Sequence, residues 1–156
     1  MTSEQQNLAS RIENRQEVDT YIARLKYALK NNSIKIKYQE NRRVDIKRED
    51  RYTNEFIMKD LFPGQDPIRV LEKELPKLKN EEYIETVKDI NKPDRSEMRV
   101  YGRIYEKGEV YIKIRVELCN VEQCFGSDLV FVMSFHYSTL KFTGKNFPYG
   151  MTGGMG

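Results

Sequence analysis

The chain has 156 residues, of which 38% are hydrophobic and 33% are charged, and its formal net charge is +3. This length suits one domain with a single core, and so small an excess of positive charge does not by itself indicate a nucleic-acid-binding protein. No segment approaches the roughly 20 apolar residues of a membrane helix, and the first residues lack the basic and apolar regions of a signal peptide. We therefore expect a cytoplasmic protein that forms a single domain over residues 1–141.

Helical periodicity dominates the first part of the chain. Apolar residues at helical spacing predict a helix over residues 4–30, and its thin apolar stripe before residue 15 suggests a helical arm on the surface. Strict alternation then predicts a short strand over residues 33–38, at the edge of a sheet. The charged run over residues 39–51 favours a solvated loop over a segment that contacts RNA.

Three further helices are expected before residue 90. Thr53 can cap the first of them, and Asp66 followed by Pro67 is a typical start for the second. Acidic residues after Asn80 suit the positive end of a helix dipole, so we predict that the third covers residues 80–87.

The most regular pattern lies between residues 98 and 118. Segments 98–105 and 109–118 each alternate apolar and polar residues, which predicts a hairpin with a three-residue loop that ends in Gly108. Pairing Tyr105 with Glu109 would gather cations and tyrosines on one face. These are Arg99, Arg103, Lys113 and Arg115, with Tyr101, Tyr105 and Tyr111. Like charges on neighbouring strands destabilise a sheet, so we expect this face to bind an anion.

Residues 129–137 predict a third strand, which is central because it is apolar on both faces at first. Ser134 and His136 are its polar exceptions, and they share a face. The three strands predict an antiparallel sheet with helices packed on its apolar face. The glycine-rich residues 142–156 predict a flexible tail.

Metal binding finds little support. Cys119 and Cys124 are the only cysteines, and His136 is the only histidine. A structural zinc site needs four ligands, so two reduced thiols in a loop are the favoured interpretation. A local disulfide stays open for an oxidising setting. We expect neither a metal nor another cofactor.

In their order, these motifs resemble the MqsR-type toxins, the motility quorum-sensing regulator family of RelE-like bacterial ribonucleases. The similarity rests on residues 78–84, on residues 100–101 followed by 108–114, and on Ser134 and Phe135 before a side chain that can transfer a proton. It implies a compact, RelE-like α+β fold with a twisted antiparallel sheet. It also implies a toxin that cleaves messenger RNA without a metal, by attack of the ribose 2′-OH, and that is held inactive by an antitoxin protein.

Position by position, the resemblance assigns catalytic roles to Tyr111 and His136, the latter where the family usually has lysine. Glu85 and Met98 stand where the family has lysine and glutamine, so these two matched positions also differ from the family. Arg103 would join the catalytic pair if Tyr111 faces His136 across the sheet. The predicted RNA-binding residues are Arg99, Tyr101, Lys113 and Arg115.

Two other functions are compatible with the same residues. The fold could carry a non-catalytic RNA-binding module, or a protein-binding module such as a phage or defence-system factor. His136 would then be an ordinary polar residue at a strand end, and Tyr111 would shield a half-exposed sheet face. The arginines of the hairpin would be partly solvated and paired with acids.

Overall fold

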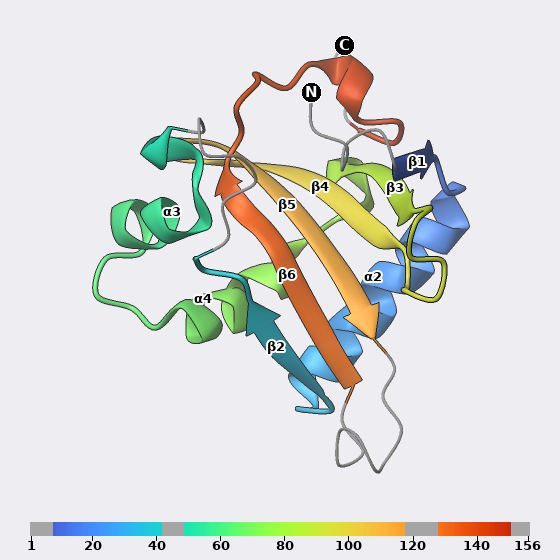
Figure 1. Cartoon of the computed structure of the whole chain (residues 1–156), viewed down its shortest axis with the longest axis horizontal. Helices are drawn as coiled ribbons and strands as arrows, with labels where there is room; N and C mark the ends of the chain where they lie inside the picture. Colours follow the sequence, from blue (N-terminus) through green and yellow to red (C-terminus); the bar gives the residue numbers. More distant parts are fainter. Residues whose placement is uncertain (1–7, 42–48, 118–127, 151–156) are drawn as a thin grey trace.

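The computed structural model describes residues 8–41, 49–117 and 128–150. Within these residues a six-stranded sheet has the order β1-β3-β4-β5-β6-β2 (Figure 1). The strands are β1 (Leu8–Arg11), β2 (Ile34–Tyr38), β3 (Tyr83–Asp89), β4 (Met98–Tyr105), β5 (Gly108–Glu117) and β6 (Asp128–Tyr137). β2 pairs with β6 in parallel, and the other neighbours are antiparallel. The α+β class is confirmed, and so is the edge position of the strand predicted near residue 34.

Three α-helices lie behind the sheet or beside it in the view of Figure 1. They are α2 (Arg15–Lys30), α3 (Asn54–Leu61) and α4 (Pro67–Glu74). The two predicted caps are confirmed, because the Thr53 side chain accepts a hydrogen bond from the amide of Phe56 and Asp66 accepts one from that of Arg69. Short 3₁₀ turns are η1 (Asp50–Tyr52), η2 (Leu75–Lys77), η3 (Asn80–Glu82) and η4 (Gly144–Asn146). Among the described residues, no helix has the length and apolar character needed to cross a membrane.

The main core lies between the helices and one side of the sheet, which we call the helix-covered face. Its sheet residues include Val110, Ile112, Ile114, Val130, Val132 and Phe135, and its helix residues include Val18, Ile22, Leu25, Ile57 and Met58. Each fully buried aliphatic side chain contributes roughly 1.5–3 kcal/mol, so this face fixes the orientation of β5 and β6. The predicted burial of Ile112 and Ile114 is confirmed.

The opposite side of the sheet, the second face, has its own smaller apolar cluster. Val87, Met98 and Val100 are buried there, and Tyr111 and Met133 pack against them. Among the described residues, this cluster contains no helix side chain. The two faces of the sheet therefore differ in what covers them.

The N-terminal helix is shorter than predicted. Leu8–Arg11 is strand β1, paired with β3, and α2 begins only at Arg15. The reason is local, because Asn14 forms a capping box with Glu17 in which each side chain bonds the other residue's amide. A capping box sets the first turn of a helix after its Asn, so residues before it are free to join the sheet.

The helix predicted over residues 80–87 is also wrong. Only the 3₁₀ turn η3 forms, and Tyr83–Asp89 continues as strand β3. Tyr83, Thr86 and Val87 are aromatic or β-branched residues that favour a pleated surface, and all three are buried in β3. Pairing with both β1 and β4 outweighs the acidic start that suggested a helix.

The hairpin register differs by one residue from the predicted one. Tyr105 pairs with Gly108 instead of Glu109, so the loop consists of residues 106–107. A shift of one residue sends every side chain of a strand to the other face. The polar residues of β4 therefore face the helices, whereas those of β5 lie on the second face. The first group is Arg99, Tyr101, Arg103 and Tyr105, and the second is Tyr111, Lys113 and Arg115.

The tail predicted over residues 142–156 is packed in its described part, residues 142–150. Phe142 and Phe147 lie over Gly102 of β4, so closely that a Cβ atom at Gly102 would be 2.7 Å from the Phe142 ring. Tyr149 stacks on Tyr83 and donates a hydrogen bond to the backbone carbonyl of Glu13. We call residues 138–150 the C-terminal segment, and Figure 1 shows it crossing the end of the sheet.

Candidate functional site

Tyr111 and His136 lie directly opposite each other on β5 and β6. Their rings stack with centroids 5.5 Å apart and planes inclined by 22°. Tyr111 is half-buried, and His136 is 7% exposed. The pairing that the sequence left open is confirmed, and it puts a phenol and an imidazole together on the second face.

The backbone sets the tautomer of His136. Its Nδ1 lies 2.8 Å from the carbonyl oxygen of Tyr137, and a carbonyl oxygen can only accept a hydrogen bond. Nδ1 therefore carries the proton and donates it. In the neutral ring the lone pair then belongs to Nε2, which is the basic nitrogen of the ring.

Cations follow the pair along the same face. Lys113 pairs with Ser134, and Arg115 pairs with Phe131 beyond a bulge in β6. The Arg115 guanidinium carbon lies 4.7 Å above the centre of the Phe131 ring. Because alternate residues of a strand are about 6.6 Å apart, Tyr111, Lys113 and Arg115 form an evenly spaced row. We call Tyr111, Lys113, Arg115, Ser134 and His136 the second-face site.

The carboxylate of Glu85 also lies on the second face. Glu85 of β3 pairs with Val100, which pairs with Lys113, so all three side chains share the second face. The Ser10 hydroxyl donates a hydrogen bond of 2.5 Å to Glu85 Oε1 and orients it. Met98 lies on the same face, opposite Arg115. The four positions matched in the resemblance, 85, 98, 111 and 136, thus lie on four adjacent strands and on one face.

Comparison with protein-family models, curated proteins and solved structures finds no match.

Arg103, predicted to act with Tyr111 and His136, lies on the other side of the sheet. Its Nη1 is 2.9 Å from Glu82 Oε2 and 3.1 Å from the carbonyl oxygen of Lys77. Burial raises the pKa of Glu82, although the Arg103 charge opposes this shift. The structure therefore separates Arg103 from the catalytic pair, because the register of β4 is displaced by one residue.

Arg99 and Tyr101, two of the predicted RNA-binding residues, are also on the helix-covered face. Tyr101 is fully buried. Arg99 donates two hydrogen bonds to the Glu13 carboxylate, of 2.9 and 3.2 Å. Its guanidinium carbon lies 4.3 Å from the centre of the Tyr21 ring. Burial alone would raise the pKa of Glu13, but hydrogen bonds from Arg99 and Thr86 outweigh it and hold the pKa below its usual value.

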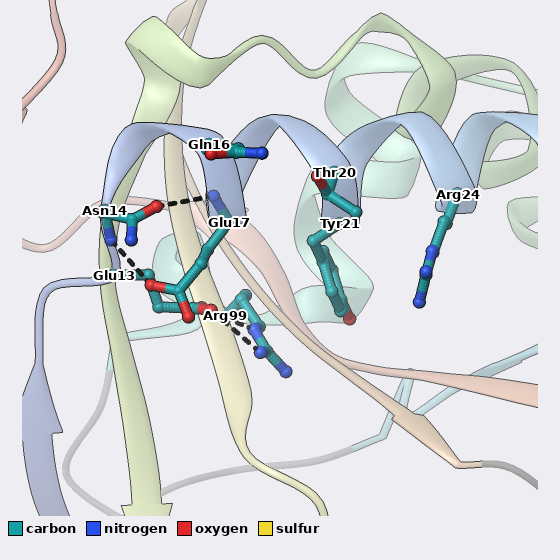
Figure 2. Close-up of a pocket in the computed structure, with 8 residues that line it drawn as sticks. All are labelled: Glu13, Asn14, Gln16, Glu17, Thr20, Tyr21, Arg24 and Arg99. Atoms are coloured by element: carbon teal, nitrogen blue, oxygen red, sulfur yellow. Dashed lines mark hydrogen bonds and ion pairs between the residues drawn. The ribbon is translucent and has the colours of Figure 1, made fainter.

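Arg99 borders a cleft of about 350 Å³ under the first turns of α2 (Figure 2). The lining residues are Glu13, Asn14, Gln16, Glu17, Thr20, Tyr21, Arg24 and Arg99. Two acids and two arginines balance each other there, and Glu13 already holds Arg99. An anion such as phosphate is therefore not favoured in this cleft. Sequence reasoning missed it, because Glu13 and Arg99 are 86 residues apart and only the fold joins them.

The described part of the chain contains no candidate metal-binding site. Residues 8–41, 49–117 and 128–150 contain no group of three His, Cys, Asp or Glu side chains that could hold a metal ion. Cys119 and Cys124, predicted to be two reduced thiols in a loop, lie outside the described residues.

Proposed function

We propose that the protein binds single-stranded RNA on the second face and cleaves it without a metal. The observation that carries this proposal is the stacked pair of Tyr111 and His136, followed by Lys113 on the same face. An imidazole with a fixed tautomer, a phenol and an ammonium group are the three kinds of group that a transesterification needs.

In the proposed reaction the ribose 2′-OH attacks the adjacent phosphorus. His136 Nε2 takes the proton of the 2′-OH as the O2′–P bond forms. Tyr111 donates its phenolic proton to the leaving 5′-oxygen as the P–O5′ bond breaks. Lys113 stabilises the negative charge of the phosphorane between these steps. The products are a 2′,3′-cyclic phosphate and a 5′-hydroxyl.

The biological role we propose is that of a cytoplasmic toxin controlled by an antitoxin protein. This part of the proposal comes from the resemblance to the MqsR-type toxins. It is supported by the common face of positions 85, 98, 111 and 136, since residues from distant parts of the chain must meet to form one site. Growth arrest on expression, relieved by a neighbouring gene, is the expected sign of this role.

The test compares wild type with His136→Gln and Tyr111→Phe on one unstructured RNA, with and without EDTA. Each substitution should lower the cleavage rate by roughly 10²-fold, the usual contribution of one acid or base, while RNA affinity stays within about twofold. Tyr27→Phe is the matched control, because Tyr27 is 71% exposed on α2. EDTA should not inhibit.

Two results would contradict the proposal in different ways. Wild type that binds RNA but never cleaves it would indicate the non-catalytic RNA-binding module. Wild type that neither binds nor cleaves RNA would favour a protein-binding module.

A further inference from the structure

The C-terminal segment brings two phenylalanine rings to the second face. Phe142 is held through its amide, which donates a hydrogen bond of 3.1 Å to Glu109 Oε1. A turn follows, in which the amide of Thr143 donates a hydrogen bond to Asn146 Oδ1, and it returns the chain so that Phe147 lies beside Phe142. The two rings meet edge to face, with their centroids 5.5 Å apart. The segment therefore presents them as one unit.

These rings occupy the place of a missing side chain on β4. Gly102 is buried, and a Cβ atom there would lie 2.7 Å from the Phe142 ring and 3.0 Å from the Phe147 ring. Gly102 pairs with Tyr111, which pairs in turn with His136. The Cβ atoms of directly opposite residues are about 4.5–5.5 Å apart. The phenylalanines, the phenol and the imidazole therefore form a line of rings across β4, β5 and β6.

The composition of the segment suits a single-stranded nucleic acid. Lys141 and Lys145 are exposed on either side of Phe142, and residues 138–150 contain no acidic side chain. Phe142 and Phe147 are only half-buried, so each keeps surface that a ligand can contact. Proteins bind single strands without reading their sequence by stacking bases on aromatic rings and holding the backbone with cations. The rings beside Tyr111 therefore suit an unpaired base.

We infer that Phe142 and Phe147 stack on the base of the nucleotide that follows the cleaved bond. This inference rests on the proposed function, which supplies the direction of the RNA. In the proposed reaction His136 faces the 2′-OH of the nucleotide before the bond, and Tyr111 protonates O5′ of the nucleotide after it. The phenylalanines lie on the other side of Tyr111 from His136. The RNA therefore runs 5′ to 3′ from β6 to β4, and its next base reaches the two rings.

The first test uses wild-type protein and RNAs of one sequence that can be cleaved at one bond only. Every ribose but one is 2′-O-methylated, because the attack needs a free 2′-OH. Removing the base that follows the cleavable bond should lower kcat/KM by roughly tenfold or more, the contribution of one stacked base. Removing a base further along the 3′ side should have little effect. An equal loss from both removals, or from neither, would overturn the inference.

The second test removes the rings and keeps apolar side chains over Gly102. A variant with Phe142→Leu and Phe147→Leu should bind single-stranded RNA roughly tenfold more weakly, and should lose the penalty for the missing base. Tyr27→Leu is the matched control, because it removes a ring that is 71% exposed on α2. It should leave affinity and penalty unchanged. Equal melting temperatures and equal tryptic cleavage after Lys141 show that the segment stays in place.

The outcomes separate this inference from the proposed function. RNA that is bound but not cleaved, with weaker binding by the leucine variant, would support the stacking surface and contradict the nuclease. Cleavage that responds neither to the missing base nor to the leucine variant would overturn the stacking alone. Tighter binding or faster cleavage by the leucine variant would mean that the segment obstructs the site, and would also overturn the stacking. Absence of RNA binding by wild type would overturn both.

Discussion

The two faces of the β4–β5 hairpin carry similar residues and use them differently. On the helix-covered face, Arg99 and Arg103 are fixed by Glu13 and Glu82, within 3 Å in each case. On the second face, Lys113 follows the stacked rings of Tyr111 and His136. An arginine in a strand thus serves the fold where a carboxylate from another element covers it. We therefore place the proposed ligand site on the second face, where the apolar cluster of the described residues contains no helix side chain.

The substitution with the largest expected effect removes the charge of Glu13, the acid that holds Arg99 on the helix-covered face. Glu13 is 4% exposed, and Glu13→Gln would leave a largely buried guanidinium with only the more distant carboxylate of Glu97, 4.0 Å away, as its counter-charge. We expect the free energy of unfolding to fall by about 3 kcal/mol, at the lower end for broken buried pairs because Arg99 keeps some exposure. Urea denaturation measures it. Glu72→Gln, on the exposed side of α4, is the control and should change stability by less than about 0.5 kcal/mol.

RNA cleavage per folded molecule should be unchanged in Glu13→Gln. A loss of cleavage that exceeds the loss of folded protein would mean that the two faces are coupled. The helix-covered face would then contribute to RNA cleavage as well as to stability.

The second test concerns the C-terminal segment, which reaches the second face beside Tyr111. Gly102→Ala would push a methyl group into the rings of Phe142 and Phe147, whose atoms lie within 3.0 Å of it. Overpacking of this kind costs about 1–3 kcal/mol, and ring displacement keeps the cost near the lower value. We expect a lower melting temperature and faster tryptic cleavage after Lys141 and Lys145.

Gly144→Ala provides the comparison within the same segment. Its Cβ would meet nothing within 4 Å, so melting temperature and cleavage should match wild type. Equal proteolysis of the two variants would show that Phe142 and Phe147 do not hold the segment on Gly102.

Sequence pattern was sufficient for the strands and insufficient for their register. Alternation over residues 98–105 and 109–118 identifies β4 and β5, since each buries one face. The turn near Gly108 allows either a two- or a three-residue loop, and these two loops put Arg103 on opposite faces. Tyrosine does not resolve the choice, because Tyr101 and Tyr105 can be buried or exposed with nearly equal ease.

Contacts between distant segments were the other limit. Nothing near Leu8 predicts that it pairs with Asp89, and nothing near Tyr83 indicates a sheet partner on each side. The meeting of Tyr111 and His136 could be stated only as a condition on the register of β6. The cleft at Arg99 had no sequence signal at all, because its acids precede and begin a helix that looked ordinary.

The third test compares one cation from each face. Lys113→Ala should weaken RNA binding by about 1 kcal/mol and reduce the log–log salt slope by about 0.7, the value for one phosphate on a single strand. Arg103→Ala removes the same charge from the helix-covered face and should leave both quantities unchanged. Fluorescence anisotropy over a salt series measures them. Equal effects of the two variants would mean that the protein's overall charge, and not the second face, attracts the RNA.

The smallest expected effect is a pH dependence of the free energy of unfolding, which arises from Glu13 on the helix-covered face. The pKa of Glu13 is below its usual value of 4.5 in the folded protein, because hydrogen bonds from Arg99 and Thr86 outweigh the effect of burial. The unfolded chain then binds a proton at a higher pH than the folded one. Glu13 therefore adds stability that is fully present above pH 4.5 and is lost as the pH falls through the lower, folded pKa.

Comparing Glu13→Gln with wild type between pH 6 and pH 3 isolates this effect. The variant cannot titrate at this position, so its stability should decline less steeply with acid, and the gap between the two proteins should narrow as the pH falls below 4.5. The effect is small because protonation removes the charge of Glu13 but leaves its side chain packed in place. A gap that stayed constant over this range would show that the carboxylate holds Arg99 through shape and hydrogen bonding, and that its charge adds nothing.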